Sequence, residues 1–261
     1  MPDTLQKQKN LLRGSIVPLL TPFLDNGDID ARGIRKLIAF QKKSGTDALF
    51  MLGGCGEGTQ LTHAQQADAL LAASAEPAGL PLLIGISDTS LDRAKENIRR
   101  LGAWNPDAYV ATLPFYSAAR PQEQLAFYAG LADYADRPVV MYNMPATVKV
   151  DIHLDVVREL STHTNIMGLK ESTDNVQRHW QLALLKKEWS SSHRPYPSER
   201  VAGGDHGAFG AGLHRHNLTG QIYDKDISRH FRPYACTAST AALSFAQNMT
   251  STLGNGMRCI P

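Results

Sequence analysis

Short apolar runs recur along the first 190 residues, each bounded by Gly, Pro, Asn or Ser. They are rich in aliphatic and β-branched residues, which is typical of strands buried on both faces of a parallel sheet. The runs are GSIVPLLTPF from Gly14, ALFMLGG from Ala48, PLLIGIS from Pro81, AYVATLP from Ala108, PVVMYNMP from Pro138 and NIMGLKES from Asn165. We expect one strand in each.

The segments between these runs have the spacing of amphipathic helices. DARGIRKLIAF places Ile34, Leu37 and Ile38 on one face, Thr62 is a suitable N-cap, and Pro121 stands where a first-turn proline is tolerated. Successive runs start roughly 27 to 34 residues apart, the length of one βα unit. Six such units predict an α/β fold, either an open doubly wound sheet or a (β/α)8 TIM barrel.

The pattern weakens from Ser190 onward, where Ile, Leu, Val and Met fall to about a seventh of residues from about a quarter before. RVAGG, from Arg200, is the best remaining strand candidate, residues 234–248 could form a helix, and no convincing eighth strand follows. We therefore expect strands seven and eight to be atypical or incomplete. The predicted division is 1–189, carrying six βα units and the site, and 190–261, an atypical segment.

Composition excludes several classes of protein. With 27 basic and 25 acidic residues the net charge is +2, which does not suggest a partner that is nucleic acid or a membrane surface. Three cysteines without CxxC spacing predict neither a disulfide framework nor a zinc site. No apolar run is long enough to span a membrane, and the polar N-terminus lacks a signal-peptide core. We expect a soluble, cytoplasmic protein.

The glycine-rich stretch GGCGEGTQLT, residues 53–62, follows the second predicted strand. It lacks both the G-x-G-x-x-G spacing and the final Lys-Ser/Thr of phosphate loops, and Glu57 would repel a pyrophosphate. Free backbone N–H groups in such a turn can bind a small carboxylate instead. The alternative is a tight turn that needs glycine only for its flexibility.

Two polar residues end predicted strands that are otherwise apolar. Tyr142 lies near the end of the fifth, where it is either a core residue or a proton-transfer group. Lys170 ends the sixth, on the edge of an α/β sheet where sites gather. A lysine partly removed from water has a lowered pKa and can attack carbonyls as the neutral amine. A salt bridge to Glu171 or Asp174 is the structural alternative.

Several motifs, in order, resemble the dihydrodipicolinate synthase / N-acetylneuraminate lyase family of class I aldolases. They are VPLLTPF in the first strand, GGCGEGTQLT, LPFYSAARPQEQL after strand four, the Y-N-x-P of YNMPATVKVD, and GLKES. The resemblance covers residues 14 to about 186. It implies a (β/α)8 barrel, usually a homotetramer, which needs no metal or organic cofactor because the protonated imine is the electron sink.

The resemblance also implies roles for particular residues. Lys170 would form a Schiff base with pyruvate or a related 2-oxo acid, and Tyr142 would transfer the proton at the aldehyde or hydroxyl oxygen. Gly54 and Cys55 occupy the place where the family binds the substrate carboxylate. Tyr116 matches a tyrosine that, in the synthase branch, reaches across a subunit interface and takes part in a proton relay of the neighbouring subunit.

Three departures from the family pattern affect the expected function. Cys55 replaces the usual hydroxyl residue, so carboxylate binding would depend more on backbone amides. Thr147 stands where the synthase branch has a carboxylate-binding arginine. This favours a lyase or aldolase acting on hydroxylated 2-oxo acids, such as 2-keto-3-deoxy sugar acids or N-acetylneuraminate, over dihydrodipicolinate synthesis. The tail departs from the pattern as a frameshifted or artificially terminated reading frame would.

Three other hypotheses remain beside the leading one. A catalytically dead family remnant would keep the motifs without a closed barrel, and its unpaired strand edges would promote aggregation. A Rossmann-type nucleotide binder disagrees with the loop spacing. A metal site using Asp205, His206, His214 and His216 fits no standard zinc pattern.

Overall fold

The computed structural model describes residues 15–76, 79–173, 175–192 and 201–202, with side chains described as far as Leu185. Its centre is a single parallel sheet of seven strands in the order β1-β2-β3-β4-β5-β6-β7. The strands are β1 (Ile16–Pro18), β2 (Ala48–Met51), β3 (Leu82–Gly85), β4 (Ala108–Thr112), β5 (Val139–Asn143), β6 (Ile166–Glu171) and β7 (Val201–Ala202).

Each strand pairs with the one that precedes it along the chain, as in a (β/α)8 barrel. A doubly wound sheet would reverse its strand order at a switch point, so the open-sheet alternative is wrong. The fold class is therefore a TIM barrel, of which the described residues supply seven strands. Within these ranges β1 pairs only with β2, and β7 only with β6.

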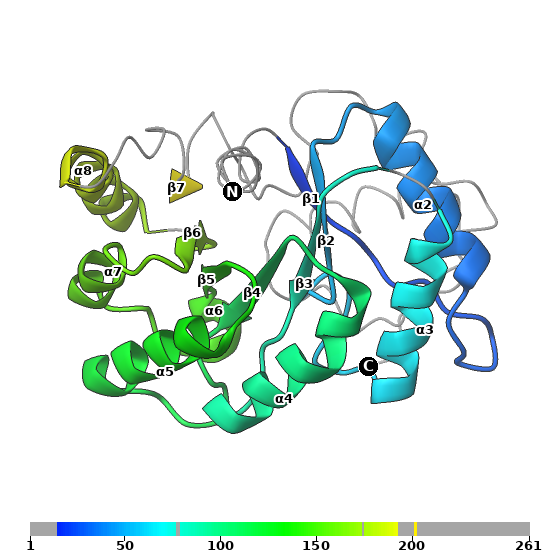
Figure 1. The fold of residues 1–261 in the computed structure, drawn as a ribbon, viewed down its shortest axis with the longest axis horizontal. Coiled ribbons are helices and arrows are strands. Elements are labelled where there is room, and N and C mark those ends of the chain that lie inside the picture. The colour runs from blue at the N-terminus through cyan, green and yellow to red at the C-terminus, as the bar shows by residue number, and fades with distance from the viewer. Residues whose placement is uncertain (1–14, 77–78, 174, 193–200, 203–261) are drawn as a thin grey trace, which may run out of the picture.

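Helices surround the outer side of the curved sheet (Figure 1). They are α2 (Ala31–Lys43), α3 (His63–Ser74), α4 (Leu91–Leu101), α5 (Pro121–Tyr134), α6 (Pro145–Val148), α7 (Leu154–Leu160) and α8 (Val176–Ser192), with a 3₁₀ turn, η1 (Gly102–Trp104). Two expected helix starts are confirmed. Thr62 caps α3 by accepting the Gln65 N–H at 3.2 Å, and Pro121 is the first residue of α5.

The apolar strand runs are buried because both faces of the sheet are covered. One core cluster fills the layer between strands and helices, and it includes Val139 and Met141. A smaller cluster fills the barrel interior, and it includes Val140 and Tyr142. The alternation along β5 therefore sends Tyr142 inward, where a TIM barrel is packed with side chains.

After β6 the described residues form α8 and β7. Val201–Ala202 confirms the strand expected in RVAGG, since it pairs with Leu169 and Lys170 of β6. Val176, Trp180 and Leu184 are exposed at four-residue intervals on α8. In a (β/α)8 barrel the next helix of the outer ring would cover such a face. Helix α8 continues through residue 189, so the division there remains a prediction, and residues 205–216 and 234–248 lie outside the described residues.

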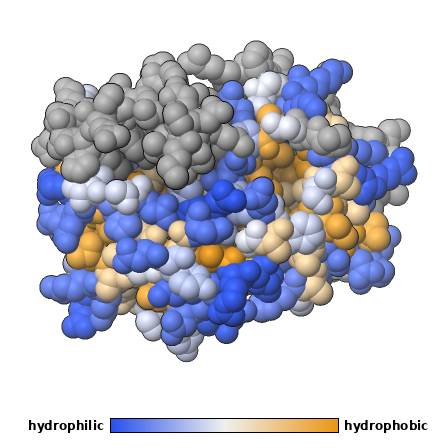
Figure 2. Space-filling view, viewed as in Figure 1, coloured by the Kyte–Doolittle hydropathy of each residue, from blue (hydrophilic) through white to orange (hydrophobic). Residues whose placement is uncertain are grey.

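The visible surface is mostly hydrophilic, and hydrophobic residues gather over the side that carries β1, β2, α2 and α3 (Figure 2). Among the helices that the structure describes, none is long and apolar enough to cross a membrane.

Candidate active site

Lys170 occupies the barrel interior at the carboxyl end of β6. It pairs in register with Tyr142 of β5, and only 5% of its surface is exposed. Burial lowers the pKa of the Lys170 amine to about 8, against the opposing, weaker effects of negative charge on Cys55 and Glu171. Desolvation disfavours the ammonium form, so an appreciable fraction of this amine is neutral and nucleophilic near neutral pH.

The ring of Tyr142 presents its face to the Lys170 amine. Lys170 Nζ is 3.8 Å from the centroid of the Tyr142 ring, close enough for a cation–π contact when the amine is charged. The Tyr142 hydroxyl contacts Met144 Sδ at 2.7 Å. Burial raises the pKa of Tyr142 to about 12, with a hydrogen bond to Ser172 acting in the opposite direction. The phenol therefore keeps its proton at neutral pH and can donate it.

Ser172 is a third polar group at this point, and sequence reasoning assigned it no role. Lys170 Nζ donates a hydrogen bond to Ser172 Oγ at 2.8 Å. A signal was available, because residues i and i+2 of an extended segment lie on the same side and Ser172 follows the lysine by two positions. Ser172 thus links the amine and the phenol.

The glycine-rich loop adjoins the Lys170–Tyr142 pair. Cys55 is half-buried and outside any disulfide, and negative charge on it would raise the pKa of both Lys170 and Tyr142. A Cβ added at Gly54 would lie 3.9 Å from Met144, the residue that contacts the Tyr142 hydroxyl. The loop therefore approaches the same cluster from the end of β2.

Close packing fixes the path of this loop. A Cβ at Gly53 would lie 2.6 Å from the Phe50 ring, and one at Gly56 would lie 2.8 Å from the Leu19 carbonyl oxygen. Thr21 Oγ1 donates to the Gly56 carbonyl at 2.7 Å. Glycine is thus needed for close approach at Gly53 and Gly56, and also at Gly58, where an added Cβ would clash with the Leu52 carbonyl oxygen.

The other two predicted site residues lie toward solvent. Thr147 is exposed on α6, and its backbone N–H donates to the Met144 carbonyl at 3.1 Å, so it lies at the rim of the cluster. Tyr116 follows β4 with a φ of 100°, in the left-handed region, and is 99% exposed. Its ring does not pack into the cluster within this chain, so its relay role stays a prediction.

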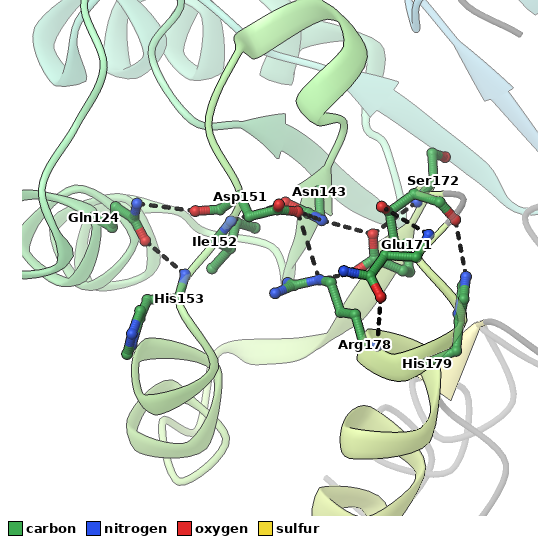
Figure 3. A network of polar contacts seen from close by, with 11 residues as sticks. Gln124, Asn143, Asp151, Ile152, His153, Glu171, Ser172, Arg178 and His179 are labelled. Atoms are coloured by element: carbon green, nitrogen blue, oxygen red, sulfur yellow. Dashed lines mark hydrogen bonds and ion pairs between the residues drawn. The ribbon is translucent and has the colours of Figure 1, made fainter.

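A buried polar network lies on the other face of β5 and β6 (Figure 3). Glu171 Oε1 accepts from Asn143 Nδ2 at 2.6 Å, and Glu171 Oε2 pairs with Arg178 Nε at 2.8 Å. Asn143 Nδ2 also donates to Asp151 Oδ1 at 2.8 Å. Glu171 is thus engaged by an arginine of α8, where the sequence had suggested a partner for Lys170. Sequence reasoning assigned no role to Asn143, Asp151 or Arg178.

Within the described ranges, no group of three or more His, Cys, Asp or Glu side chains is placed to hold a metal ion. The arrangement instead offers a buried amine, a protonated phenol and a glycine-rich loop in one place. Its chemical capacity is covalent carbonyl chemistry with proton transfer.

The chain is similar in sequence to known enzymes. A 4-hydroxy-tetrahydrodipicolinate synthase from Anaeromyxobacter sp. is 33% identical over 172 residues, 66% of this chain and 58% of its own length. One from Idiomarina loihiensis is 30% identical over 173 residues, with the same coverage. The chain thus spans about 58% of the length of these relatives.

Solved structures give the same result. An Escherichia coli K12 prophage protein of the dihydrodipicolinic acid synthase family, in complex with pyruvate, matches with a TM-score of 0.65 and 28% identity, covering 71% of this chain and 62% of that one. The Aquifex aeolicus dihydrodipicolinate synthase matches with a TM-score of 0.62 and 27% identity, covering 67% and 59%. The family model of the dihydrodipicolinate synthetase family matches residues 11–194. The chain therefore belongs to the dihydrodipicolinate synthetase family.

Proposed function

We propose that the protein is a class I lyase or aldolase in which Lys170 forms a Schiff base with pyruvate or a related 2-oxo acid. The observation that carries this proposal is the buried Lys170 amine, with its pKa lowered to about 8, facing Tyr142 at 3.8 Å. The pyruvate complex of the E. coli prophage protein supports pyruvate as the ketone.

The proposed steps balance without a further reagent. Neutral Lys170 Nζ attacks the ketone carbon to give a carbinolamine, which takes up one proton from solvent and loses one water to give a protonated imine. The imine withdraws electrons, so a proton can leave the adjacent methyl carbon for solvent, which gives an enamine. The enamine adds to an aldehyde, and the reverse sequence is cleavage. Tyr142 donates or accepts the proton at the aldehyde or hydroxyl oxygen.

The substrate carboxylate would lie at the glycine-rich loop. Backbone N–H groups of Gly54 and Cys55 can bind it there, beside the amine that attacks the ketone. Within the family, Thr147 favours hydroxylated 2-oxo acids of the 2-keto-3-deoxy sugar acid or N-acetylneuraminate type. The names of the curated relatives favour the second candidate, 4-hydroxy-tetrahydrodipicolinate synthase.

Oligomeric state and location belong to the same proposal. A homotetramer in the cytoplasm is what the family resemblance implies, and the 99% exposed Tyr116 would be available to a neighbouring subunit. Light scattering of the purified protein tests the tetramer. A monomer that is active would remove the proposed relay role of Tyr116.

Borohydride trapping tests the central step. The protein is mixed with pyruvate, reduced with sodium borohydride and mapped by peptide mass spectrometry. We expect a reduced pyruvyl adduct on Lys170 in the wild type and none there in Lys170→Met. A folded wild type that carries no adduct at Lys170 with pyruvate or other 2-oxo acids would contradict the proposal and support the catalytically dead alternative.

A further inference from the structure

A β-bulge decides which way Lys170 points. Ile166 packs in the outer cluster, and strict alternation from Ile166 would place Lys170 on the same outer face. The register shifts between Val139 and Val140, so that Val139 pairs with Ile166 but Val140 pairs with Gly168. Met167 is the extra residue and packs inward. The bulge thus turns Lys170 into the barrel.

The bulge leaves the register of the strand ends to be held by other contacts. After it, Tyr142 pairs with Lys170, and the next pair along is Asn143 with Glu171. A slip of one residue would exchange the faces, placing a carboxylate inside and the amine outside. The Asn143–Glu171 pair lies immediately beyond the proposed catalytic pair and points the opposite way.

Asn143 uses its whole amide to join three segments. Its Nδ2 donates to Glu171 Oε1 at 2.6 Å and to Asp151 Oδ1 at 2.8 Å, while its Oδ1 accepts from Ile152 N at 2.8 Å. Its backbone carbonyl accepts from Ser172 N at 3.0 Å. Asn143 is 1% exposed, so water cannot replace these bonds if the strands shift.

Arg178 connects the strand ends to α8. Its side chain is 7% exposed and pairs with the Glu171 carboxylate, whose side chain is fully buried, at 2.8 Å. Asp151 Oδ1 lies 3.6 Å from the same Nε. Removing one member of a buried ion pair leaves an uncompensated charge, which makes alternative placements of Glu171 costly.

We propose that Asn143, Glu171 and Arg178 are positioning residues that hold the register of β5 and β6, and through it the face-to-face placement of Lys170 and Tyr142. The inference rests on the proposed function, because that function defines what the placement is for. None of the three touches the reacting atoms. Asn143 and Glu171 directly follow Tyr142 and Lys170 along the two strands, so their side chains point to the opposite face.

The test compares two buried asparagines. Asn143→Ala removes the bridge between β5 and β6. Asn97→Ala is the matched control, since Asn97 on α4 is 6% exposed and also makes three side-chain hydrogen bonds, to Ile86, Asp88 and Arg100. Each variant is assayed for thermal unfolding and for the rate of borohydride-trapped adduct formation on Lys170 across pyruvate concentrations.

We expect the trapping rate at saturating pyruvate to fall about tenfold or more in Asn143→Ala, because misplacing a reacting group is costly. The half-saturating pyruvate concentration should change little, since the carboxylate loop follows β2. Asn97→Ala should stay within roughly twofold of wild type at a comparable loss of Tm.

An Asn143→Ala rate that stays within roughly twofold of wild type, or an equal loss in Asn97→Ala, overturns the proposal. If Asn143→Ala does not fold, Asn143→Ser is used with the same expectations. If the wild type traps no adduct, the proposed function fails, and the positioning proposal is judged by trace labelling of Lys170 with acetic anhydride. A changed labelling rate in the Asn143 variant, but not in the control, supports it, and an unchanged rate overturns it.

Discussion

Lys170 Nζ lies 3.8 Å from the centroid of the Tyr142 ring, and the two residues are register partners in β6 and β5. The aromatic face lies beside the amine, but the same enclosure removes water from it. Burial is the larger effect, because the pKa of Lys170 falls to about 8 in spite of nearby negative charge. Burial of Lys170 therefore lowers the stability of the fold, and it also supplies the neutral amine that the proposed chemistry needs.

That cost should depend on pH. The unfolded chain binds a proton at Lys170 up to its ordinary pKa of 10.5, whereas the folded protein loses it near 8. Below pH 8 the folded state carries the full cost of a buried charge, about 3 kcal/mol, and the cost disappears as the pH rises toward 10.5. We expect Lys170→Met to be more stable than wild type at pH 7, by an amount that shrinks by pH 9.5.

Urea unfolding of both proteins at the two pH values measures this difference. Lys95→Met, on α4, is the control, because Lys95 Nζ also lies over a tyrosine ring, 5.4 Å from the centroid of Tyr134, but its side chain is only half-buried. A Lys170→Met advantage that grows between pH 7 and 9.5 would contradict the assigned burial.

Cys55→Ser should shift the pH dependence of imine formation. Negative charge on Cys55 raises the pKa of Lys170, so a neutral hydroxyl in its place should lower the midpoint of the pH–rate curve for trapping. A hydroxyl is also a better hydrogen-bond donor than a thiol, so half-saturation should need less pyruvate. Trapping rates measured from pH 6 to 9.5 give both quantities. A midpoint that moves upward would show that the thiol acts otherwise.

Tyr142→Phe should separate imine formation from proton transfer. The ring remains beside Lys170, so the trapped adduct should still form. Exchange of the pyruvate methyl protons with D₂O, followed by NMR, reports the enamine without any choice of aldehyde. Because Tyr142 is assigned to the proton at the aldehyde or hydroxyl oxygen, we expect this exchange to stay within roughly twofold of wild type, whereas condensation or cleavage should slow by about 10²-fold, as for loss of a general acid or base. Exchange that slows by a similar factor would contradict this restriction of Tyr142 to the oxygen step.

Neighbouring glycines of the loop should tolerate alanine differently. Gly53→Ala places a Cβ 2.6 Å from the Phe50 ring, whereas Gly54→Ala meets only Met144, at 3.9 Å. Overpacking of this kind costs about 1–3 kcal/mol, so Gly53→Ala should lower the free energy of unfolding by that amount and Gly54→Ala by much less. Chemical unfolding measures both, and an equal cost at the two positions would argue against the packing described.

Thr147→Arg tests what distinguishes the two candidate functions. Thr147 is exposed on α6 at the rim of the site, so an arginine can be accommodated there without repacking the core. A guanidinium binds a carboxylate in bidentate fashion, so the variant should gain activity toward aldehydes that carry a carboxylate. Wild type should prefer uncharged hydroxylated aldehydes. A wild type that already prefers the carboxylate-bearing aldehyde would favour the synthase.

The sequence predicts much of this arrangement because buried strands appear in it as apolar runs. Six apolar runs indicated six strands, and a lysine ending the run NIMGLKES indicated the centre of the site. The sequence does not indicate the bulge at Met167, since a methionine fits either face of the sheet. Strict alternation along the strand would turn Lys170 outward. The Asn143–Glu171 bond was equally hidden, because it joins residues 28 apart through a register that only the folded sheet defines.

The sequential strand order also has a consequence for how the site comes into being. Every described strand pairs with the one synthesised just before it, and the residues at the Lys170 cluster lie between positions 54 and 172. On a ribosome this stretch emerges before the last third of the chain. The contacts that unite the amine, the phenol and the loop are therefore of the kind that can form in a nascent, N-terminal intermediate. The residues after position 172 are synthesised later than every group of the Lys170 cluster.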